Sequence, residues 1–406
     1  MKKPEILSPA GDMEKLRYAV AYGADAVYLA GSQFGMRTGA GNFTYEEMAE
    51  AVKHCHENSV KVMVTVNTMP RNNEFAVIDE HIRKIAECGA DGVIVADIGV
   101  LEVVKRVAPQ LRITISTQAN VTNYGAATAY YNMGANRVVL ARELTLDEVI
   151  HIRENTPPEL EIETFIHGSM CMSISGRCLL SNYMTGRDSN RGNCAQPCRW
   201  KYHLVEEKRP GQYMPIIEDD KGSYIFNSKD MCMIEHIPAL VKAGINSFKI
   251  EGRAKSAYYT AAITKAYRKA IDLYFEDPEN YELPDSIRDE IFKVSHRQYF
   301  NGFYFGDTNS QDYNENIYIR DWDIVAVVDG KDENGLTLLT QKNKFFANDT
   351  LEVLRPDGEC VQFVPEILRN ERDEDIESAP HAEMKLKMKL PCDAPALSII
   401  RKEKTN

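Results

Sequence analysis

The 406-residue sequence has no apolar run that approaches the length of a membrane span, so it predicts no transmembrane helix. Its first residues, MKKPEILSPAG, also lack the apolar core of a signal peptide. We therefore expect a cytoplasmic protein with no membrane partner. In such a reducing compartment the nine cysteines are not expected to form disulfides. Metal binding, redox chemistry and simple burial remain as their possible roles.

Positive charge is scarce in this chain. Lys and Arg number 48 against 60 Asp and Glu, which gives a net charge of −12 and a pI of about 5.4. A surface of this sign repels nucleic acid as a whole, so a broad phosphate-binding face is disfavoured. The segment 177–201 is a local exception, with a single acidic residue, Asp188, among five basic ones: Arg177, Arg187, Arg191, Arg199 and Lys201. Such a segment fits a phosphate-bearing substrate, although it is equally typical of a solvated face.

A repeated unit occupies the first 275 residues: a short β-branched strand, then an amphipathic helix that ends in glycine. The pattern predicts eight strands, around Glu5–Ser8, Ala26–Ala30, Val62–Asn67, Val93–Asp97, Ile113–Gln118, Val138–Ala141, Glu161–Ile166 and Ser247–Glu251. Helices are expected between them, for example Tyr45–Asn58, Phe75–Cys88 and Ile98–Ala108. This alternation predicts an α/β fold of the TIM (β/α)8 type. A doubly wound sheet is disfavoured because no G-x-G-x-x-G follows the first strand.

Three changes of pattern divide the chain. The barrel is expected to span residues 1–280, interrupted after its seventh strand by a long polar insertion at 167–225. A connector at 281–316 follows, and from 317 to 406 short alternating strands with D-G and N-G turns predict a small antiparallel β-barrel. Since the insertion leaves the carboxyl end of a barrel strand, we expect it to cover the catalytic face.

The insertion contains four cysteines, Cys171, Cys178, Cys194 and Cys198, in the pattern C-x6-C-x15-C-x3-C. Structural zinc sites usually pair cysteines two to four residues apart, and this spacing matches poorly. Four thiolates on irregular backbone are the usual ligands of an iron–sulfur cluster, which is the favoured interpretation. Structural zinc and reduced buried thiols stay open as alternatives. Cys232, expected at the start of an amphipathic helix, is held as a possible fifth ligand.

Polar residues follow the predicted strands, where a TIM barrel places its active site. The candidates are Ser8 to Gly11, Asn67, Asp97, Ser116, Gln118, Asn120, Asn123, Arg142, Glu143, His167, Glu251 and Arg253. Arg142 and Arg253 are predicted to bind carboxylates of an anionic small molecule. Each candidate also has a structural interpretation, since Glu251 could pair with Arg253 and Asp97 could cap a helix. His167 is either a ligand or proton carrier, or a hydrogen-bonded histidine under the loop.

Hydrolase motifs are missing. The sequence contains neither H-E-x-x-H nor G-x-S-x-G, so it indicates neither a zinc peptidase nor an elbow serine hydrolase. A cysteine protease needs one exposed, activated thiolate with a histidine partner, whereas four thiols that share a metal are poor nucleophiles. Peptidase activity is therefore disfavoured on chemical grounds.

Three blocks of sequence carry a family resemblance: LSPAGDMEKLRYAVAYGADAVYLAG, the cysteine block FIHGSMCMSISGRCLLSNYMTGRDSNRGNCAQPCRW, and SFKIEGRAKSAYY. They resemble the collagenase-like peptidase family U32, and within it the bacterial tRNA hydroxylation proteins. The resemblance covers nearly the whole chain, including the C-terminal module, which is similar to the second domain of elongation factor Tu.

The resemblance implies an oxygen-independent tRNA hydroxylase that forms 5-hydroxyuridine at the wobble position of the anticodon, with prephenate as the hydroxyl source. It implies an iron–sulfur cluster, most simply 4Fe-4S, held by Cys171, Cys178, Cys194 and Cys198. Arg142, Glu251, Arg253 and His167 are the expected catalytic residues. The alternatives are a peptidase, as the family name states, a hydroxylase of ribosomal RNA or of a quinone precursor, and a non-catalytic RNA-binding factor.

Overall fold

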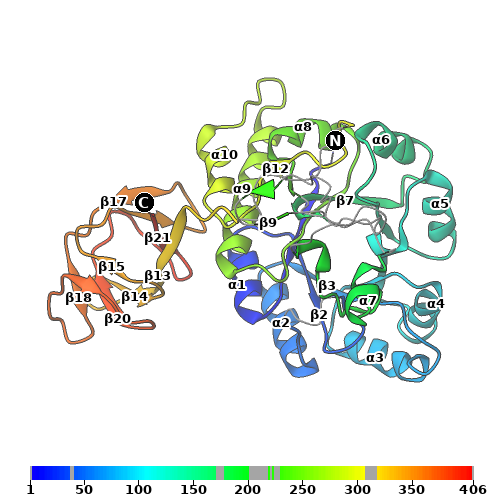
Figure 1. Ribbon diagram of the computed structural model, residues 1–406, viewed down its shortest axis with the longest axis horizontal. Coiled ribbons are helices and arrows are strands. Elements are labelled where there is room, and N and C mark those ends of the chain that lie inside the picture. Colours follow the sequence, from blue (N-terminus) through cyan, green and yellow to red (C-terminus); the bar gives the residue numbers. More distant parts are fainter. Residues whose placement is uncertain are drawn as a thin grey trace, which may run out of the picture.

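The computed structural model describes residues 2–36, 41–170, 178–200, 218–219, 222–223, 229–306 and 318–404. Two bodies are visible in Figure 1, a large barrel ringed by helices and a small β-domain beside it. None of the helices in these ranges is both long and apolar enough to cross a membrane.

Eight parallel strands form the predicted barrel. Each strand pairs with the next along the chain, and pairing of the last with both the first and the seventh closes the ring. The strands are β1 (Glu5–Pro9), β2 (Ala26–Ala30), β3 (Lys61–Val66), β4 (Gly92–Val95), β5 (Arg112–Ile115), β6 (Arg137–Val139), β7 (Glu161–Ser169) and β11 (Ser247–Ile250). The fold prediction is confirmed, with strand ends that differ from the expected ones by up to three residues.

Helices alternate with the barrel strands and cover their outer side (Figure 1). They are α1 (Met13–Ala21), α2 (Tyr45–Glu57), α3 (Phe75–Glu87), α4 (Ile98–Val107), α5 (Tyr124–Asn132), α6 (Leu146–Glu154), α8 (Ile237–Lys242) and α9 (Ala257–Glu276). Local sequence fixes several of their starts. Thr44 with Glu47, and Thr145 with Glu148, form capping boxes that satisfy the first free N–H groups of α2 and α6.

Shorter elements lie outside the regular alternation of the barrel. They are α7 (Leu180–Thr185), α10 (Asp285–Phe292), the short strands β8 (Glu218–Asp219), β9 (Gly222–Ser223), β10 (Asp230–Cys232) and β12 (Tyr299–Phe300), and 3-10 turns at Thr117–Ala119, Ser189–Arg191, Pro197–Arg199 and Ile234–His236. The expectation that Cys232 begins a helix is wrong. It ends β10, which pairs antiparallel with the extended end of β7, and the next α-helix begins only at Ile237.

The C-terminal domain is an antiparallel sheet of seven strands that curves into a half-barrel, in the order β17-β16-β21-β13-β14-β20-β18. Its strands are β13 (Trp322–Lys331), β14 (Thr337–Gln341), β15 (Phe345–Phe346), β16 (Leu351–Leu354), β17 (Val361–Phe363), β18 (Leu368–Asn370), β19 (Ser378–Ala379), β20 (Lys385–Met388) and β21 (Ile399–Glu403). β15 and β19 form a separate pair.

A buried ionic cluster joins the two domains. Arg401 on β21 has no exposed surface, and its guanidinium contacts the carboxylates of Glu290 on α10 and Glu352 on β16. On the barrel side, the Tyr22 hydroxyl donates to the backbone carbonyls of Leu354 and Leu397 at 3.1 and 2.9 Å. A buried arginine bonded to two carboxylates is costly to open, so the small domain is held firmly against α9 and α10.

Candidate active site at the barrel mouth

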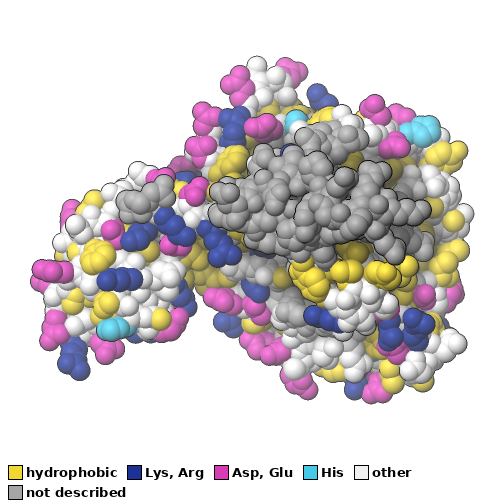
Figure 2. Space-filling model, in the orientation of Figure 1, with side chains coloured by type: hydrophobic (Ala, Val, Ile, Leu, Met, Phe, Trp, Pro, Cys, Tyr) yellow, Lys and Arg dark blue, Asp and Glu magenta, His cyan; other side chains and the backbone are white. Residues whose placement is uncertain are grey.

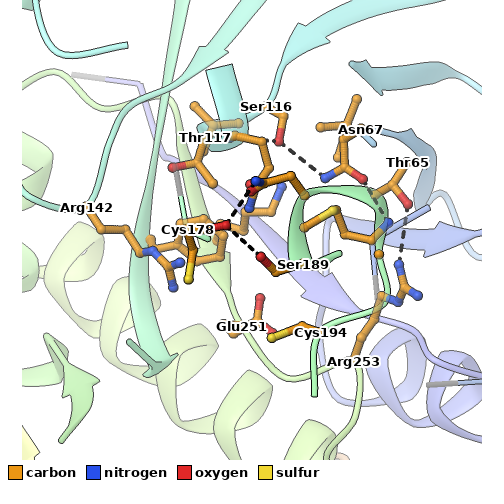
Figure 3. Close-up of a pocket in the computed structure, with 18 of the residues that line it drawn as sticks. Thr65, Asn67, Ser116, Thr117, Arg142, Cys178, Ser189, Cys194, Glu251 and Arg253 are labelled. Carbon is orange, nitrogen blue, oxygen red and sulfur yellow. Dashed lines mark hydrogen bonds between the residues drawn. The ribbon is translucent and has the colours of Figure 1, made fainter. Parts of the chain in front are cut away.

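A pocket of about 150 Å³ opens at the carboxyl ends of the barrel strands, which is the expected catalytic face (Figure 3). Its walls come from two sources. The strand ends contribute Asn67, Ser116, Gln118, Arg142, Glu251 and Arg253, and the insertion contributes Cys178, Ser189, Asn190, Cys194 and Cys198. The described part of the insertion therefore forms part of the pocket wall at the barrel mouth, where its place after the seventh strand predicts it.

Three of the four predicted cluster ligands line this pocket together. Cys178, Cys194 and Cys198 are partly buried there and none is in a disulfide, whereas Cys171 lies outside the described residues. The backbone around them is held by the insertion itself: the Cys178 carbonyl accepts hydrogen bonds from Ser189 Oγ and Asn190 Nδ2 at 2.8 and 3.0 Å. These contacts fix where the first of the three thiols enters the pocket.

The donor set fits an iron–sulfur cluster. Three reduced thiols on irregular backbone face one cavity, and the backbone N–H of Gln196 donates to Cys194 Sγ at 3.3 Å. Hydrogen bonds of this kind to sulfur are among the features that set the potential of such clusters. Cys178, Cys194 and Cys198, with Cys171 outside the described part, are the residues that would hold the group.

Arg142 follows β6 and lies on one side of the pocket in the view of Figure 3. Its Nη1 donates to the Ser169 carbonyl at 3.0 Å, and its guanidinium carbon lies 4.9 Å from the ring centre of Phe165. The side chain is 7% exposed. A backbone carbonyl and an aromatic face thus hold the guanidinium plane in a fixed orientation.

Arg253 follows β11 on the other side of the pocket in the same view. Its Nη1 and Nη2 donate to Thr65 Oγ1 and Asn42 Oδ1, at 3.4 and 3.1 Å. Close backbone packing sets this position, because a Cβ on Gly11 would lie 2.2 Å from the Arg253 carbonyl oxygen. The glycine of the predicted Ser8–Gly11 segment therefore acts by leaving room for the segment that bears Arg253.

Glu251, the third predicted pocket residue of this group, is placed by another glycine. Its N–H donates to the His167 carbonyl at 2.9 Å, and a Cβ on Gly168 would lie 2.4 Å from the Glu251 carbonyl oxygen. Gly168 also has φ +108°, which favours glycine. The paired ends of β7 and β11 therefore aim the carboxylate of Glu251 into the pocket.

The wider set of polar candidates separates into two groups. Asn67 Nδ2 donates to Ser116 Oγ at 3.3 Å, and both side chains line the pocket with Gln118. Three of the other candidates have structural contacts. Asp97 and Asn123 cap α4 and α5, and Ser8 Oγ shares a buried hydrogen bond of 2.8 Å with Thr264. The structural interpretation of Asp97 is confirmed.

His167 lies behind the pocket wall, outside the described residues that line the pocket. It is 1% exposed and packs against the rings of Tyr259, Tyr267 and Tyr299, with Nδ1 3.3 Å from the Tyr267 hydroxyl. Burial lowers the pKa of His167 well below its usual value, so the ring is neutral. Its position favours the hydrogen-bonded histidine over the proton carrier or ligand.

Cys232 lies opposite His167 in the β10–β7 pairing and shares its surroundings. Its Sγ is 3.9 Å from the Tyr267 hydroxyl, and burial raises the pKa of the thiol to about 11. Cys232 does not occur among the described lining residues of the pocket. Its surroundings favour packing over ligation.

Sequence reasoning missed Lys249, which rises from β11 into the floor of the pocket. Its Nζ donates to Glu163 Oε1 at 2.9 Å and lies 4.6 Å from the ring centre of Tyr28. Glu163 also accepts from Arg137, so a chain of buried charges runs along the barrel axis beneath the pocket. The signal was a lysine in the middle of a buried strand, which is rare unless the charge has a partner.

Both domains match one protein family. Residues 11–314 match peptidase family U32, and residues 320–401 match the peptidase family U32 C-terminal domain.

Three curated relatives carry different descriptions. The chain is 38% identical to tRNA hydroxylation protein P1 of Bacillus subtilis (strain 168), over 96% of this chain and 92% of that protein. It is 44% identical to an uncharacterized protease of Methanocaldococcus jannaschii, over 75% of this chain and 74% of that protein. It is 37% identical to a 23S rRNA 5-hydroxycytidine synthase of Escherichia coli (strain K12), over 71% of this chain and 42% of that protein.

Proposed function

This chain belongs to peptidase family U32, and we propose that it is an RNA-modifying enzyme that hydroxylates a uridine of tRNA. The descriptions of two relatives, a tRNA hydroxylation protein and a ribosomal RNA 5-hydroxycytidine synthase, support RNA hydroxylation as the class of reaction. The specific reaction proposed is oxygen-independent formation of 5-hydroxyuridine at the wobble position, with prephenate as the hydroxyl source.

One observation carries the proposal: three thiols of the cysteine motif and the guanidinium groups of Arg142 and Arg253 line the same pocket. The proposed hydroxylation takes its hydroxyl from a bound donor in place of dioxygen, and the base is oxidised as the donor is reduced. When bound to Cys178, Cys194 and Cys198, an iron–sulfur cluster would supply one-electron transfer. The arginines would bind the donor.

Prephenate is a dicarboxylate, and two buried arginines on opposite sides of one pocket suit such a molecule. Arg142 would hold one carboxylate and Arg253 the other, with Lys249 adding positive charge to the floor. The reaction replaces a hydrogen on the pyrimidine ring with a hydroxyl, which oxidises the base by two electrons. The donor loses its hydroxyl and gains hydrogen, so it is reduced by two electrons and the exchange balances without dioxygen.

The rim of the pocket suits an unstacked base. Leu179 and Tyr183 on and beside α7 are 70% and 85% exposed, and Trp200 is 43% exposed. Figure 2 shows hydrophobic side chains gathered at the place of α7 in Figure 1, with Lys and Arg side chains beside them. The same segment of the sequence contains Arg187 and Arg191. Exposed aromatic rings next to cations form the usual platform for single-stranded RNA bases.

A peptidase is the less well supported function. A cysteine peptidase needs a histidine beside its thiolate, and no histidine occurs among the described residues that line the pocket. His167, the nearest candidate in sequence, is neutral and surrounded by tyrosines.

The nucleoside content of tRNA tests the proposed reaction. Mass spectrometry of tRNA from a strain without this gene should show loss of 5-hydroxyuridine and its derivatives, with recovery on complementation. Unchanged levels, in a strain that also lacks any paralogue, would remove the tRNA assignment. Release of peptides from casein or gelatin by the purified protein would support the peptidase instead.

A pair of variants tests the cluster. Protein purified without oxygen should contain iron and sulfide, and Cys194→Ser should lose both together with hydroxylation. The matched control is Cys392→Ser, which removes a partly buried thiol in the small domain and should retain them. Iron-free wild-type protein that still modifies RNA would overturn this part of the proposal.

A further inference from the structure

A second cavity lies beside the barrel mouth. Its volume is about 200 Å³, several times the ~30 Å³ that a water molecule occupies in the liquid, so a phosphate group fits. The residues that line it include Ser169, Gln196, Glu251, Ala254, Lys255 and Tyr318. Because Glu251 lines both this cavity and the active-site pocket, ligands in the two would be one side chain apart.

The position of the cavity in the barrel is informative. Ser169 ends β7 and residues 251–255 follow β11, so the cavity lies at the ends of the seventh and eighth barrel strands. In TIM barrels this region frequently binds phosphate. Position alone does not show an anion site. Whether the cavity can bind an anion depends on the charges around it.

Three cations surround the ring of Tyr318. The Nζ of Lys255 lies 4.5 Å from the ring centre, and the guanidinium carbons of Arg297 and Arg320 lie at 4.8 and 5.8 Å. Arg297 Nη2 donates to the Tyr318 hydroxyl at 3.0 Å, so the phenol accepts this bond and can donate its own hydrogen to a ligand. Figure 2 shows Lys and Arg side chains gathered where the small domain meets the barrel.

Two carboxylates counter part of this charge. Asp230 lies 3.7 Å from Lys255 Nζ and 3.8 Å from an Arg297 nitrogen, which is the long limit of an ion pair. Glu251 lines the cavity wall on the side of the active-site pocket. Lys255 keeps 16% of its side chain exposed, and Arg320 is exposed. Among the described residues named in these contacts, three cations face two carboxylates, on a protein that is acidic overall.

We propose that this cavity binds a backbone phosphate of the RNA, next to the nucleotide whose base enters the active-site pocket. The proposal rests on the proposed function and adds to it the way in which the backbone is positioned. Phosphate contacts fix the register of a bound nucleic acid while base contacts select the sequence. Lys255 and Tyr318 would bind the phosphate oxygens, and Arg297 would orient the phenol.

Binding of a synthetic anticodon stem–loop RNA with a wobble uridine tests the proposal. We expect Lys255→Gln to raise the Kd about tenfold and to reduce the slope of log Kd against log salt by about 1. Arg320→Gln, an exposed side chain, should raise the Kd about threefold. The matched control is Lys53→Gln on the outer face of α2, which should leave both quantities unchanged. Equal values for Lys255→Gln and Lys53→Gln would overturn the proposal.

Uncharged backbone linkages give a test that does not depend on how the variants fold. Stem–loops with one methylphosphonate on either side of the uridine are compared with the natural RNA. With wild-type protein one substitution should raise the Kd about tenfold, and with Lys255→Gln the same substitution should have no further effect. If the methylphosphonate and Lys255→Gln instead weaken binding additively, Lys255 contacts another group.

The results separate this inference from the proposed function. If the RNA binds with this coupling but is never hydroxylated, the inference stands and the function falls. If hydroxylation proceeds and Lys255→Gln raises the KM for prephenate without changing RNA affinity, the cavity serves the small anion and the inference falls. If wild-type protein binds no RNA, both fall.

Discussion

Two arginines, one at the start of β6 and one just after its end, differ in what surrounds them. Arg137 begins the strand at the amino end of the barrel, where its guanidinium contacts Glu5, Glu161 and Glu163 at 2.7 to 2.9 Å. Arg142 lies five residues later at the carboxyl end, held by the Ser169 carbonyl and the Phe165 ring. Both are buried, with 6% and 7% exposed.

The difference indicates that the two ends of the barrel have different roles. At the amino end, Arg137 is surrounded by carboxylates that it neutralises, which ties strands β1, β6 and β7 together. At the carboxyl end, the Ser169 carbonyl and the Phe165 ring orient Arg142 in the wall of a pocket. We infer that Arg137 serves the fold and Arg142 serves a ligand, and the following changes test this contrast.

Removal of Arg137 should have the largest effect. Arg137→Met leaves buried carboxylates without their partner, so we expect a loss of about 3–5 kcal/mol in the free energy of unfolding. Denaturant unfolding measures it. Arg112→Met is the control, because Arg112 contacts the same Glu161 from a half-exposed position and should cost at most about 1 kcal/mol. A folded, fully stable Arg137→Met protein would contradict the structural role.

Arg142→Gln should show the opposite profile. We expect kcat/KM for RNA hydroxylation to fall about 10²-fold because the donor loses its orientation, while the unfolding free energy changes by about 1 kcal/mol. Arg142→Lys keeps the charge but loses the planar fork, so its activity should lie between that of the wild type and that of Arg142→Gln. A loss of stability without a loss of activity would show that Arg142, like Arg137, serves the fold.

His167→Gln tests a residue behind the pocket wall. The substitution disturbs the hydrogen bonds to Tyr267 and Tyr299, so we expect a loss of about 1–3 kcal/mol in unfolding free energy. Hydroxylation by the folded variant should change less than about tenfold, since general acid–base groups contribute ~10²–10⁴. Nucleoside analysis and denaturant unfolding together check this. An activity loss as large as that of Arg142→Gln would restore a catalytic role.

Acid should narrow the difference between wild type and Arg137→Met. Burial raises the pKa of Glu5, but the charge of Arg137 outweighs burial and holds the pKa below 4.5. A carboxyl with a lowered folded pKa stabilises above about pH 4.5 and loses that stabilisation as pH falls through the folded pKa. The stability gap between the two proteins should therefore shrink below pH 4.5.

Two buried histidines give a common background in that experiment. Burial lowers the pKa of His81 and His296 from 6.5 to about 4, so protonation of the unfolded chain destabilises both proteins as pH falls from 6.5 towards 4. Because this loss of stability is the same in both proteins, it cancels in the stability gap between wild type and Arg137→Met. Unfolding midpoints measured from pH 7 to pH 3 give the result, and a gap that stays constant would show that Arg137 does not control these carboxyls.

Much of the fold was predictable because local patterns and tertiary structure agree there. The barrel strands are continuous β-branched runs, and Thr44, Asp97 and Thr145 cap helices where the sequence places them. The prediction failed at Cys232, where β10 pairs with the extended end of β7. Three residues of strand carry no period that distinguishes them from the start of a helix, and only the neighbouring strand decides.

The candidate site was predictable in outline. Residues that follow barrel strands gather at one mouth, so Arg142, Glu251 and Arg253 were placed correctly from their positions alone. Lys249 was missed because it lies within a strand, and its partner Glu163 lies 86 residues earlier in the chain. The histidine at 167 follows the same rule as the arginines, yet it faces a layer of tyrosines.

The sequence by itself determined the alternation of strands and helices, the long insertion after the seventh strand and the four-cysteine motif within it, because each depends on residues close together along the chain. Only the tertiary structure decided which groups meet: three thiols beside Arg142 and Arg253, Lys249 below them, and Tyr318 among three cations at the domain junction. Side-chain direction and long-range pairing follow from the closure of the barrel, which no local pattern encodes.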